Sequence, residues 1–196
     1  MALFSSWIDF LFPPLCLACK ERCRTKFLCP SCWNLCALPD PVERCRHCFE
    51  ELDGRGNLCK QCRFEKLLPA ERAYVFDPES PARYLGVEWA EAMASFALIQ
   101  WIQLEWPRPH AVIAMPDKDS ITIGSAFAAM QQVPFVKALR QNHEYVDDRL
   151  EEDEIYLLFD VSNSLENLKK SANSLSLSFP KRIYLLSLFP YVDRVS

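Results

Sequence analysis

Residues 16–62 read CLACKERCRTKFLCPSCWNLCALPDPVERCRHCFEELDGRGNLCKQC, and all ten cysteines of the chain lie within them. Eight of these cysteines form four pairs with two residues between the members. That gap lets both thiolates of a tight turn face one metal ion, and two such turns complete the tetrahedron that Zn²⁺ prefers. The predicted ligands are Cys16, Cys19, Cys29, Cys32, Cys45, Cys48, Cys59 and Cys62. This stretch therefore predicts a ribbon with two structural zinc ions.

The ribbon divides into two similar halves. Residues 16–32 and 45–62 have nearly the same cysteine spacing, and the stretch LPDP at 38–41 forms a natural break between them. We therefore assign one ion to the first two pairs and the other to the last two. A cross-braced arrangement, in which the first pair shares an ion with the third, is the alternative. Because so small a module buries little apolar surface, we expect zinc to supply most of its folding energy.

A disulfide framework is the competing interpretation of ten cysteines in a short segment. The start of the chain argues against it, because residues 1–15 lack the positive flank and the small-residue cleavage site of a secretory signal. Without secretion, the cytosol would keep these thiols reduced. Cys23 and Cys36 each follow a pair by four residues. We expect them to be small buried side chains, with ligation of an iron cluster as the alternative.

Composition and charge limit the classes of function. The chain has 196 residues, half of them hydrophobic, and a formal net charge of −4, which is not the global charge of a nucleic-acid-binding protein. Two ions, each bound by four thiolates, would add a charge of about −4 to the mildly basic ribbon. No apolar stretch reaches the length that spans a bilayer. The sequence therefore predicts a cytoplasmic protein without a membrane span.

After residue 66 the pattern changes to alternating strands and helices. Apolar runs bounded by turn residues predict strands, and longer stretches with apolar residues at helical spacing predict helices. The expected strands are 72–76, 111–115, 133–136, 155–159 and 183–188, and the expected helices are 88–104, 121–132 and 165–174. Such alternation is typical of an α/β fold with a mainly parallel sheet. We therefore predict a double zinc ribbon at 1–66 and an α/β domain at 67–196, with any ligand site at the turns after the strands 111–115 and 155–159.

Several motifs resemble the competence-protein ComF family, bacterial proteins with a zinc ribbon ahead of a phosphoribosyltransferase-like domain. They are the stretch LFPPLCLAC at 11–19, the pair LCPSC at 28–32, the later cysteine pairs and the strand end VIAMP at 112–116. The strand at 155–160 falls where that family has its motif for phosphoribosyl pyrophosphate (PRPP). The resemblance implies the same two-part architecture and a role in DNA uptake or competence, with DNA-uptake proteins or single-stranded DNA as partners.

The PRPP motif of that family is an apolar strand followed by two acids and a Thr-Thr-Gly-type loop that opens a helix. The acids bind the ribose hydroxyls, and the loop with the helix N-terminus holds the 5′-phosphate. Here Phe159 replaces the first acid and Leu165 replaces the glycine, which leaves Asp160 as the candidate catalytic residue. The candidate phosphate loop is Ser162, Asn163 and Ser164. Mg²⁺ is expected as a cofactor only if PRPP binds.

The turn after the strand 111–115 also departs from the family. Where the family has a basic stretch for pyrophosphate, this chain has DKDSITIG at 117–124, with one lysine between two aspartates. Because the aspartates repel an anion, this turn is a poor pyrophosphate site. We therefore expect a ComF-like protein with impaired phosphoribosyl transfer. An active PRPP-dependent transferase is the alternative, so the sequence leaves enzymatic activity open.

A third hypothesis assigns binding of single-stranded nucleic acid to the ribbon. Its candidate stacking residues are Trp33, Phe27 and Phe49, which lie beside basic residues at 20–26, 44 and 46. The competing interpretation places these aromatic rings in the core of the ribbon and the charges on solvated faces. Titration with PRPP and Mg²⁺ separates the impaired ComF-like protein from the active transferase. Binding of labelled single-stranded DNA tests the third hypothesis.

Overall fold

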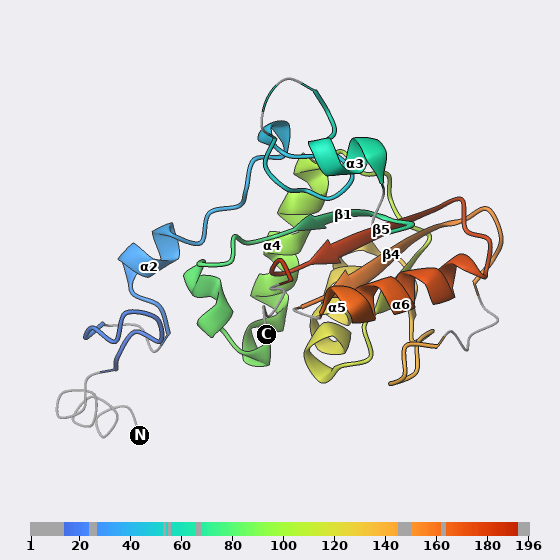
Figure 1. Ribbon diagram of the computed structural model, residues 1–196. Coiled ribbons are helices and arrows are strands. Elements are labelled where there is room, and N and C mark those ends of the chain that lie inside the picture. The colour runs from blue at the N-terminus through green and yellow to red at the C-terminus, as the bar shows by residue number, and fades with distance from the viewer. Residues whose placement is uncertain are drawn as a thin grey trace.

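The structure is a computed structural model of the chain, and it describes residues 14–23, 27–52, 54, 56–65, 68–144, 150–161 and 164–191. Its elements, in chain order, are α2 (Pro30–Asn34), η1 (Pro41–Glu43), α3 (Lys60–Phe64), β1 (Glu71–Tyr74), η2 (Pro81–Tyr84), η3 (Val87–Trp89), α4 (Ala90–Gln103), β2 (Ala111–Ala114), α5 (Lys118–Gln131), β3 (Phe135–Val136), β4 (Ile155–Asp160), α6 (Leu165–Ser176) and β5 (Arg182–Ser187). Figure 1 shows the half of the ribbon around α2 extending to one side of the sheet and the half around α3 lying above it.

A five-stranded sheet forms the centre of the α/β part. Its order is β1-β5-β4-β2-β3, and every pair of neighbouring strands is parallel. The prediction of an α/β fold with a mainly parallel sheet is therefore confirmed. The strands β4 and β5 are buried beyond their first residues and mostly apolar, because helices cover both faces of the sheet.

Helices cover the two faces of this sheet in separate layers. On one face, Leu157 of β4 belongs to the same hydrophobic cluster as Phe127 of α5, and α4 packs beside α5. On the other face, the next residue, Leu158, clusters with Leu168 of α6. Figure 1 shows α6 in front of the sheet, with α4 and α5 behind it. Successive side chains of β4 thus enter opposite layers, as the pleat of a strand requires.

The strand order creates a topological switch point between β2 and β4. The chain passes from β2 through α5 to β3 on one side, and from β4 through α6 to β5 on the other. The carboxyl ends of β2 and β4 are adjacent, because the N–H of Met115 donates to the carbonyl oxygen of Phe159 at 2.9 Å. Ligands of open α/β sheets bind at such a point. The two turns that the sequence singled out therefore lie side by side.

Both of these turns end in helix caps. α5 begins at Lys118 because Asp117 accepts a hydrogen bond from the N–H of Ser120 at 2.8 Å, so the expected start at residue 121 is wrong by one turn. α6 begins at Leu165 as expected, and Ser164 caps it by accepting from the N–H of Asn167. The acidic residues at 117 and 119 therefore lie at the N-terminus of α5, where Asp117 caps the helix.

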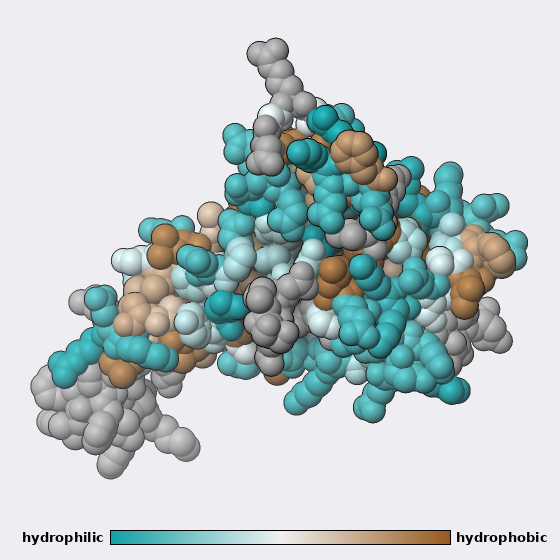
Figure 2. Space-filling view, in the orientation of Figure 1, coloured by the Kyte–Doolittle hydropathy of each residue, from teal (hydrophilic) through white to brown (hydrophobic). Residues whose placement is uncertain are grey.

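The ribbon and the α/β part share a continuous hydrophobic core. Leu28 and Phe49 of the ribbon belong to the same buried cluster as Phe76 and Trp101. Figure 2 shows hydrophobic colour gathered around α2, in contrast to the hydrophilic surface around α6. The boundary between residues 66 and 67 stays a prediction, but described residues from both halves of the ribbon pack against the sheet domain.

Candidate functional site

The structure brings the eight predicted zinc ligands together in two foursomes. The ligand atoms within each foursome all lie within 4.8 Å of one another, and the foursomes are Cys16, Cys19, Cys29, Cys32 and Cys45, Cys48, Cys59, Cys62. Tetrahedral zinc with Zn–S bonds of about 2.3 Å separates its sulfurs by about 3.8 Å. The sulfurs of Cys19 and Cys29 lie 3.8 Å apart, and those of Cys48 and Cys59 lie 3.6 Å apart. Each foursome could therefore hold one zinc ion, and the grouping is sequential and not cross-braced.

Local backbone structure positions the thiols in each half of the ribbon. Cys29 and Cys59 are the N-cap residues of the short helices α2 and α3, which carry the fourth ligand of each foursome. The Cys59 sulfur accepts a hydrogen bond from the N–H of Cys62 at 3.4 Å, and the Cys16 sulfur accepts one from the N–H of Cys29 at 3.3 Å. Amide donors of this kind stabilise thiolate ligands and fix their direction.

Within each foursome the thiols ionise unequally. Burial raises the pKa of a thiol, but backbone amide donors outweigh it at Cys16, whose pKa is lowered to about 6, and at Cys45, whose pKa is lowered to about 7. Burial and the neighbouring thiols raise the pKa of Cys32 and Cys62 to about 12. Each foursome thus has one thiolate near neutral pH and at least one thiol that loses its proton only when a metal binds.

The two remaining cysteines belong to neither foursome. Cys36 is buried, its thiol donates to the carbonyl of Cys32 at 3.5 Å, and burial raises its pKa. Cys23 is half-buried, and its N–H donates to the carbonyl of Pro14. All ten cysteines lie in the described part of the chain, and each of them is free of disulfide bonds. The structure therefore gives no support to a disulfide framework.

Asp160, the candidate catalytic residue, lies at the carboxyl end of β4 and is only 1% exposed. Its carboxylate accepts a hydrogen bond from the hydroxyl of Ser187 at 3.1 Å. In the next residue, the N–H of Val161 donates to the hydroxyl oxygen of Ser120 at 3.0 Å. A ribose or phosphate group would have to displace these internal contacts before it could use the same atoms.

The structure does not bring the other residues proposed from the PRPP motif together with Asp160 in one site among the described residues. Ser162 and Asn163 lie outside the described residues, and Ser164 is the exposed N-cap of α6. Phe159, which replaces the first acid, is fully buried, and its ring centroid lies 5.8 Å from that of Phe127 in α5. The first acid of the family motif thus corresponds to a residue of the hydrophobic core here.

Of the aromatic residues proposed to stack on nucleic acid, Phe49 is buried, and Phe27 and Trp33 are half-buried against other aromatic rings. Phe49 is 2% exposed, Phe27 makes an edge contact with Trp89 at 4.4 Å between ring centroids, and Trp33 stacks on Phe96 at 6.4 Å. The structure therefore places these three rings where the ribbon meets the α/β part. Among the basic candidates, Lys20, Arg22 and Arg46 are exposed, and the residues at 24 and 26 lie outside the described part.

A cavity of about 560 Å³ lies between the second half of the ribbon, the amino ends of β1 and β5, and the carboxyl end of α4. Its lining includes four arginines, at positions 44, 46, 72 and 182. Three of them pair with carboxylates: Arg44 with Asp77 at 3.1 Å, Arg72 with Glu50 at 3.0 Å and Arg182 with Glu71 at 3.4 Å. Since these pairs largely balance the charge, the cavity is not a strong site for an anion.

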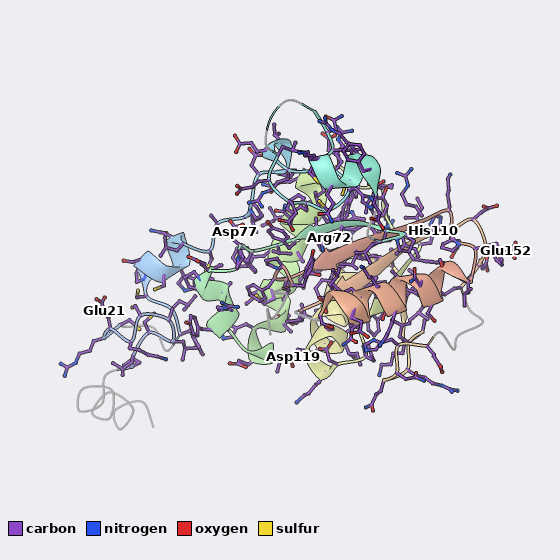
Figure 3. All side chains as sticks on the ribbon, in the orientation of Figure 1. Glu21, Arg72, Asp77, His110, Asp119 and Glu152 are labelled. Atoms are coloured by element: carbon purple, nitrogen blue, oxygen red, sulfur yellow. The ribbon has the colours of Figure 1, made fainter. Side chains whose placement is uncertain are left out.

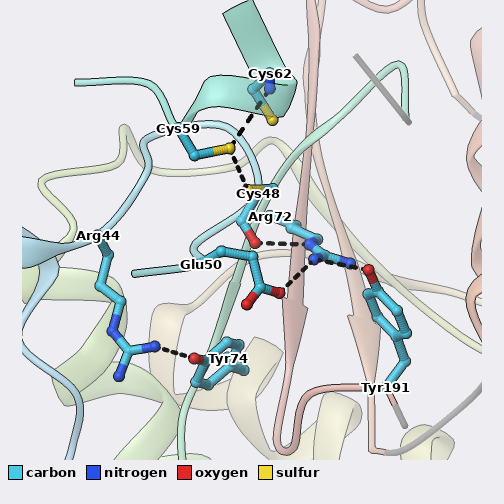
Figure 4. Close-up of polar contacts among 8 residues, drawn as sticks. All are labelled: Arg44, Cys48, Glu50, Cys59, Cys62, Arg72, Tyr74 and Tyr191. Carbon is cyan, nitrogen blue, oxygen red and sulfur yellow. Dashed lines mark hydrogen bonds and ion pairs between the residues drawn. The ribbon is translucent and has the colours of Figure 1, made fainter. Parts of the chain in front are cut away.

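Arg72 is a buried residue that neither the cysteine spacing nor the family motifs indicate. Figure 3 places it between the second half of the ribbon and the sheet, whereas Asp119 lies at the far end of the sheet domain, in the first turn of α5. Its guanidinium donates to the carbonyl of Cys48, to Glu50 and to the hydroxyl of Tyr191 (Figure 4). The available signal was a cation at the start of the expected strand 72–76, whose other residues are apolar or aromatic, because a buried arginine requires specific partners.

No protein-family model, curated protein or solved structure matches this chain. The resemblance to ComF therefore rests on the motifs quoted above. Within the residues that the structure describes, no helix combines the length and the apolar character needed to cross a membrane.

The metal foursomes are best suited to a structural role. Four cysteines saturate the coordination of a zinc ion, so no position is left for a catalytic water or a substrate. Both foursomes consist of cysteines that are largely buried, with Cys19 as the exposed exception. The chemistry expected of them is therefore to hold the ribbon together and against the sheet.

Proposed function

We propose that this chain is a ComF-like protein of phosphoribosyltransferase type in which two structural zinc sites hold a ribbon against an α/β scaffold that is impaired in transfer, and that it acts in DNA uptake or competence. The two cysteine foursomes and the parallel sheet support this architecture. The switch point between β2 and β4 lies where a transferase of this kind would hold its ligand.

The hydrogen bond between Ser120 and Val161 carries the proposal that transfer is impaired. Binding of PRPP requires backbone amides and acids that face the ligand at this turn. Here the Val161 N–H donates to the hydroxyl of Ser120, and the Asp160 carboxylate accepts a hydrogen bond from Ser187. Asp117 caps α5. These internal bonds support a scaffold that is kept for binding and structure.

Calorimetric titration of the full zinc-loaded chain with PRPP and Mg²⁺ tests this proposal. We expect no binding heat at millimolar PRPP. Saturable binding that is lost in Asp160→Asn but kept in Ser125→Ala, whose hydroxyl bonds within α5, would overturn the proposal and favour the active transferase. Zinc content near two ions per chain, measured on the same samples, ensures that the protein tested is folded.

The DNA-related role needs a separate experiment, because it does not depend on PRPP. In a transformable bacterium that lacks its own ComF protein, this chain is expected to restore transformation, and the Cys59→Ser variant is expected not to do so. Failure of the intact chain to restore any transformation would argue against the role in uptake.

Direct binding of single-stranded DNA is the alternative that the exposed cations Lys20, Arg22 and Arg46 favour. It predicts a rise in the fluorescence anisotropy of labelled DNA when the protein binds. The affinity should fall as salt rises, because binding releases counterions from the DNA phosphates. The packing of Phe27, Trp33 and Phe49 favours the opposite result, which is no saturable binding at micromolar protein. Salt-dependent binding that charge reversal at Arg46 abolishes would establish the alternative.

A further inference from the structure

We propose that Arg72 of β1 is a positioning residue for the second zinc site, so that zinc binding there and attachment of the ribbon to the sheet edge stabilise each other. The site is the foursome Cys45, Cys48, Cys59 and Cys62. The inference concerns the metal and the fold alone, and it holds whether or not the chain binds PRPP or DNA.

Two successive carbonyls of the zinc-binding turn bind Arg72. Its backbone N–H donates to the carbonyl of His47 at 2.9 Å, and its Nε donates to the carbonyl of Cys48 at 2.7 Å. These carbonyls belong to the two peptide planes on either side of the Cys48 α-carbon. Because each peptide unit is rigid, fixing both planes fixes the backbone dihedral angles of Cys48 and the direction of the Cα–Cβ bond that carries its thiol. Arg72 thus orients a ligand without touching the metal.

The remaining contacts hold the guanidinium in place. Its Nη2 lies 3.0 Å from the Glu50 carboxylate and 3.1 Å from the hydroxyl of Tyr191, and its Cζ lies 4.3 Å from the centroid of the Tyr191 ring. Figure 4 shows these contacts converging on Arg72 from the ribbon and from the end of the chain. The side chain is 7% exposed, so its positive charge depends on these partners.

Loss of zinc from the second site would therefore affect the sheet. Cys48 and Glu50 both belong to the turn that the metal holds together. If this turn loosens, a buried guanidinium loses a carbonyl and a carboxylate, and the N–H of Arg72 in the edge strand β1 loses its acceptor. Unpaired buried charge is strongly unfavourable. Zinc at this site consequently stabilises the edge of the sheet.

Among the described residues, the carbonyls next to the ligands of the first zinc site accept no such hydrogen bond from the α/β part, so this site serves as an internal control. Its half of the ribbon meets the α/β part through aromatic contacts, such as Trp33 with Phe96 and Phe27 with Trp89. In the described part of the chain, no hydrogen bond joins the α/β part to a backbone carbonyl of Cys16, Cys19, Cys29 or Cys32. A change at Arg72 should therefore leave the first site unaltered.

Zinc competition with a chromophoric chelator on the full chain tests the first half of the proposal. Linkage is reciprocal, so Arg72 must raise zinc affinity if zinc stabilises its contacts. Residues that orient metal ligands typically contribute about 10- to 100-fold to metal affinity. We expect Arg72→Met to lower the affinity for one of the two zinc ions by at least about 10-fold. The control is Arg182→Met, which removes an arginine of β5 that pairs with Glu71. It is expected to leave the affinity for both zinc ions unchanged.

Single-site variants assign the weakened ion. The Cys19→Ser variant keeps the second site intact, and the effect of Arg72→Met is expected in full in this background. The Cys59→Ser variant keeps the first site intact, and there Arg72→Met is expected to have no effect on zinc affinity. Arg72→Lys keeps the charge with less of the geometry, and it gives an intermediate loss even if Arg72→Met folds poorly.

Hydrogen exchange of β1 tests the reciprocal half. Removing zinc from the second site by Cys59→Ser should speed exchange of the β1 amides, that of Arg72 above all, because the His47 carbonyl that accepts from it belongs to the loosened turn. Cys19→Ser should leave β1 protected. Wild-type affinity at the second site in both Arg72 variants would overturn the proposal, as would unchanged β1 protection in Cys59→Ser.

Discussion

The hydroxyl oxygen of Ser120 accepts a hydrogen bond from the backbone N–H of Val161 at 3.0 Å, which joins the first turn of α5 to the residue that follows β4. Ser120 is fully buried, and its own N–H donates to Asp117. The two turns of the switch point are thereby bonded to each other. An amide that a phosphate could bind in a nucleotide site stabilises the fold here.

Replacing this serine should destabilise the protein without affecting zinc. In Ser120→Ala the Val161 amide loses its acceptor, and we expect a loss of about 1–3 kcal/mol in the free energy of unfolding. Urea unfolding in the presence of zinc measures it. Ser125→Ala is the matched control, because its half-buried hydroxyl bonds within α5 to the Thr122 carbonyl. Equal losses in the two variants would contradict this role of Ser120.

Restoring the first acid of the family motif should not restore PRPP binding. Phe159 is fully buried between the sheet and α5, where an added β-carbon on Gly124 would already lie 3.3 Å from the Phe159 ring. Phe159→Asp would place an unpaired carboxylate in this core, so we expect a loss of at least about 3 kcal/mol in stability. Phe159→Leu should lose less than about 1.5 kcal/mol. A folded Phe159→Asp protein that binds PRPP would show that this expectation is wrong.

The aromatic contacts between the ribbon and the α/β part should matter for stability and not for DNA. Trp33 is half-buried against Phe96 and Trp89, so Trp33→Ala is expected to lower the free energy of unfolding by about 2 kcal/mol, less than a fully buried ring. Phe64 is 86% exposed, and Phe64→Ala should change stability by less than about 0.5 kcal/mol. A loss of DNA binding in Trp33→Ala at unchanged stability would favour the stacking hypothesis instead.

Zinc binding should release protons and strengthen as pH rises. The thiols of Cys32 and Cys62, with pKa values of about 12, are protonated at pH 8 before a metal binds and must ionise to become ligands. We therefore expect at least one proton released per ion at pH 8. Calorimetry in buffers with different ionisation enthalpies measures this number.

Acid should add further competition for zinc. Below pH 7 and then below pH 6, protons bind to Cys45 and Cys16, whose pKa values are about 7 and about 6. The number of protons released per ion should therefore rise as pH falls from 8 to 5, and zinc affinity should fall more steeply. Zinc release that does not depend on pH in this range would contradict the ionisation states assigned to these thiols.

Local pattern was sufficient for the metal foursomes and for the types of the elements. The spacing of each cysteine pair is a property of one tight turn, so the eight candidate ligands follow from residues 16–62, whereas their sequential grouping was decided by the structure over the cross-braced alternative. Apolar runs such as 155–159 likewise indicate buried strands whatever their neighbours are. Even the early start of α5 had a local signal, because Asp117 is a good N-cap residue.

Tertiary structure alone decided what surrounds these elements. The order β1-β5-β4-β2-β3, the burial of Asp160 beside Ser187 and the bond from Arg72 to Cys48 all join residues far apart in the chain. No periodicity encodes such contacts, since they depend on how whole elements pack. The sequence by itself thus indicated two four-cysteine groups that could hold zinc and a parallel α/β scaffold. Only the packing determined that Asp160 is bonded inside the sheet and that the second cysteine foursome is attached to the sheet edge.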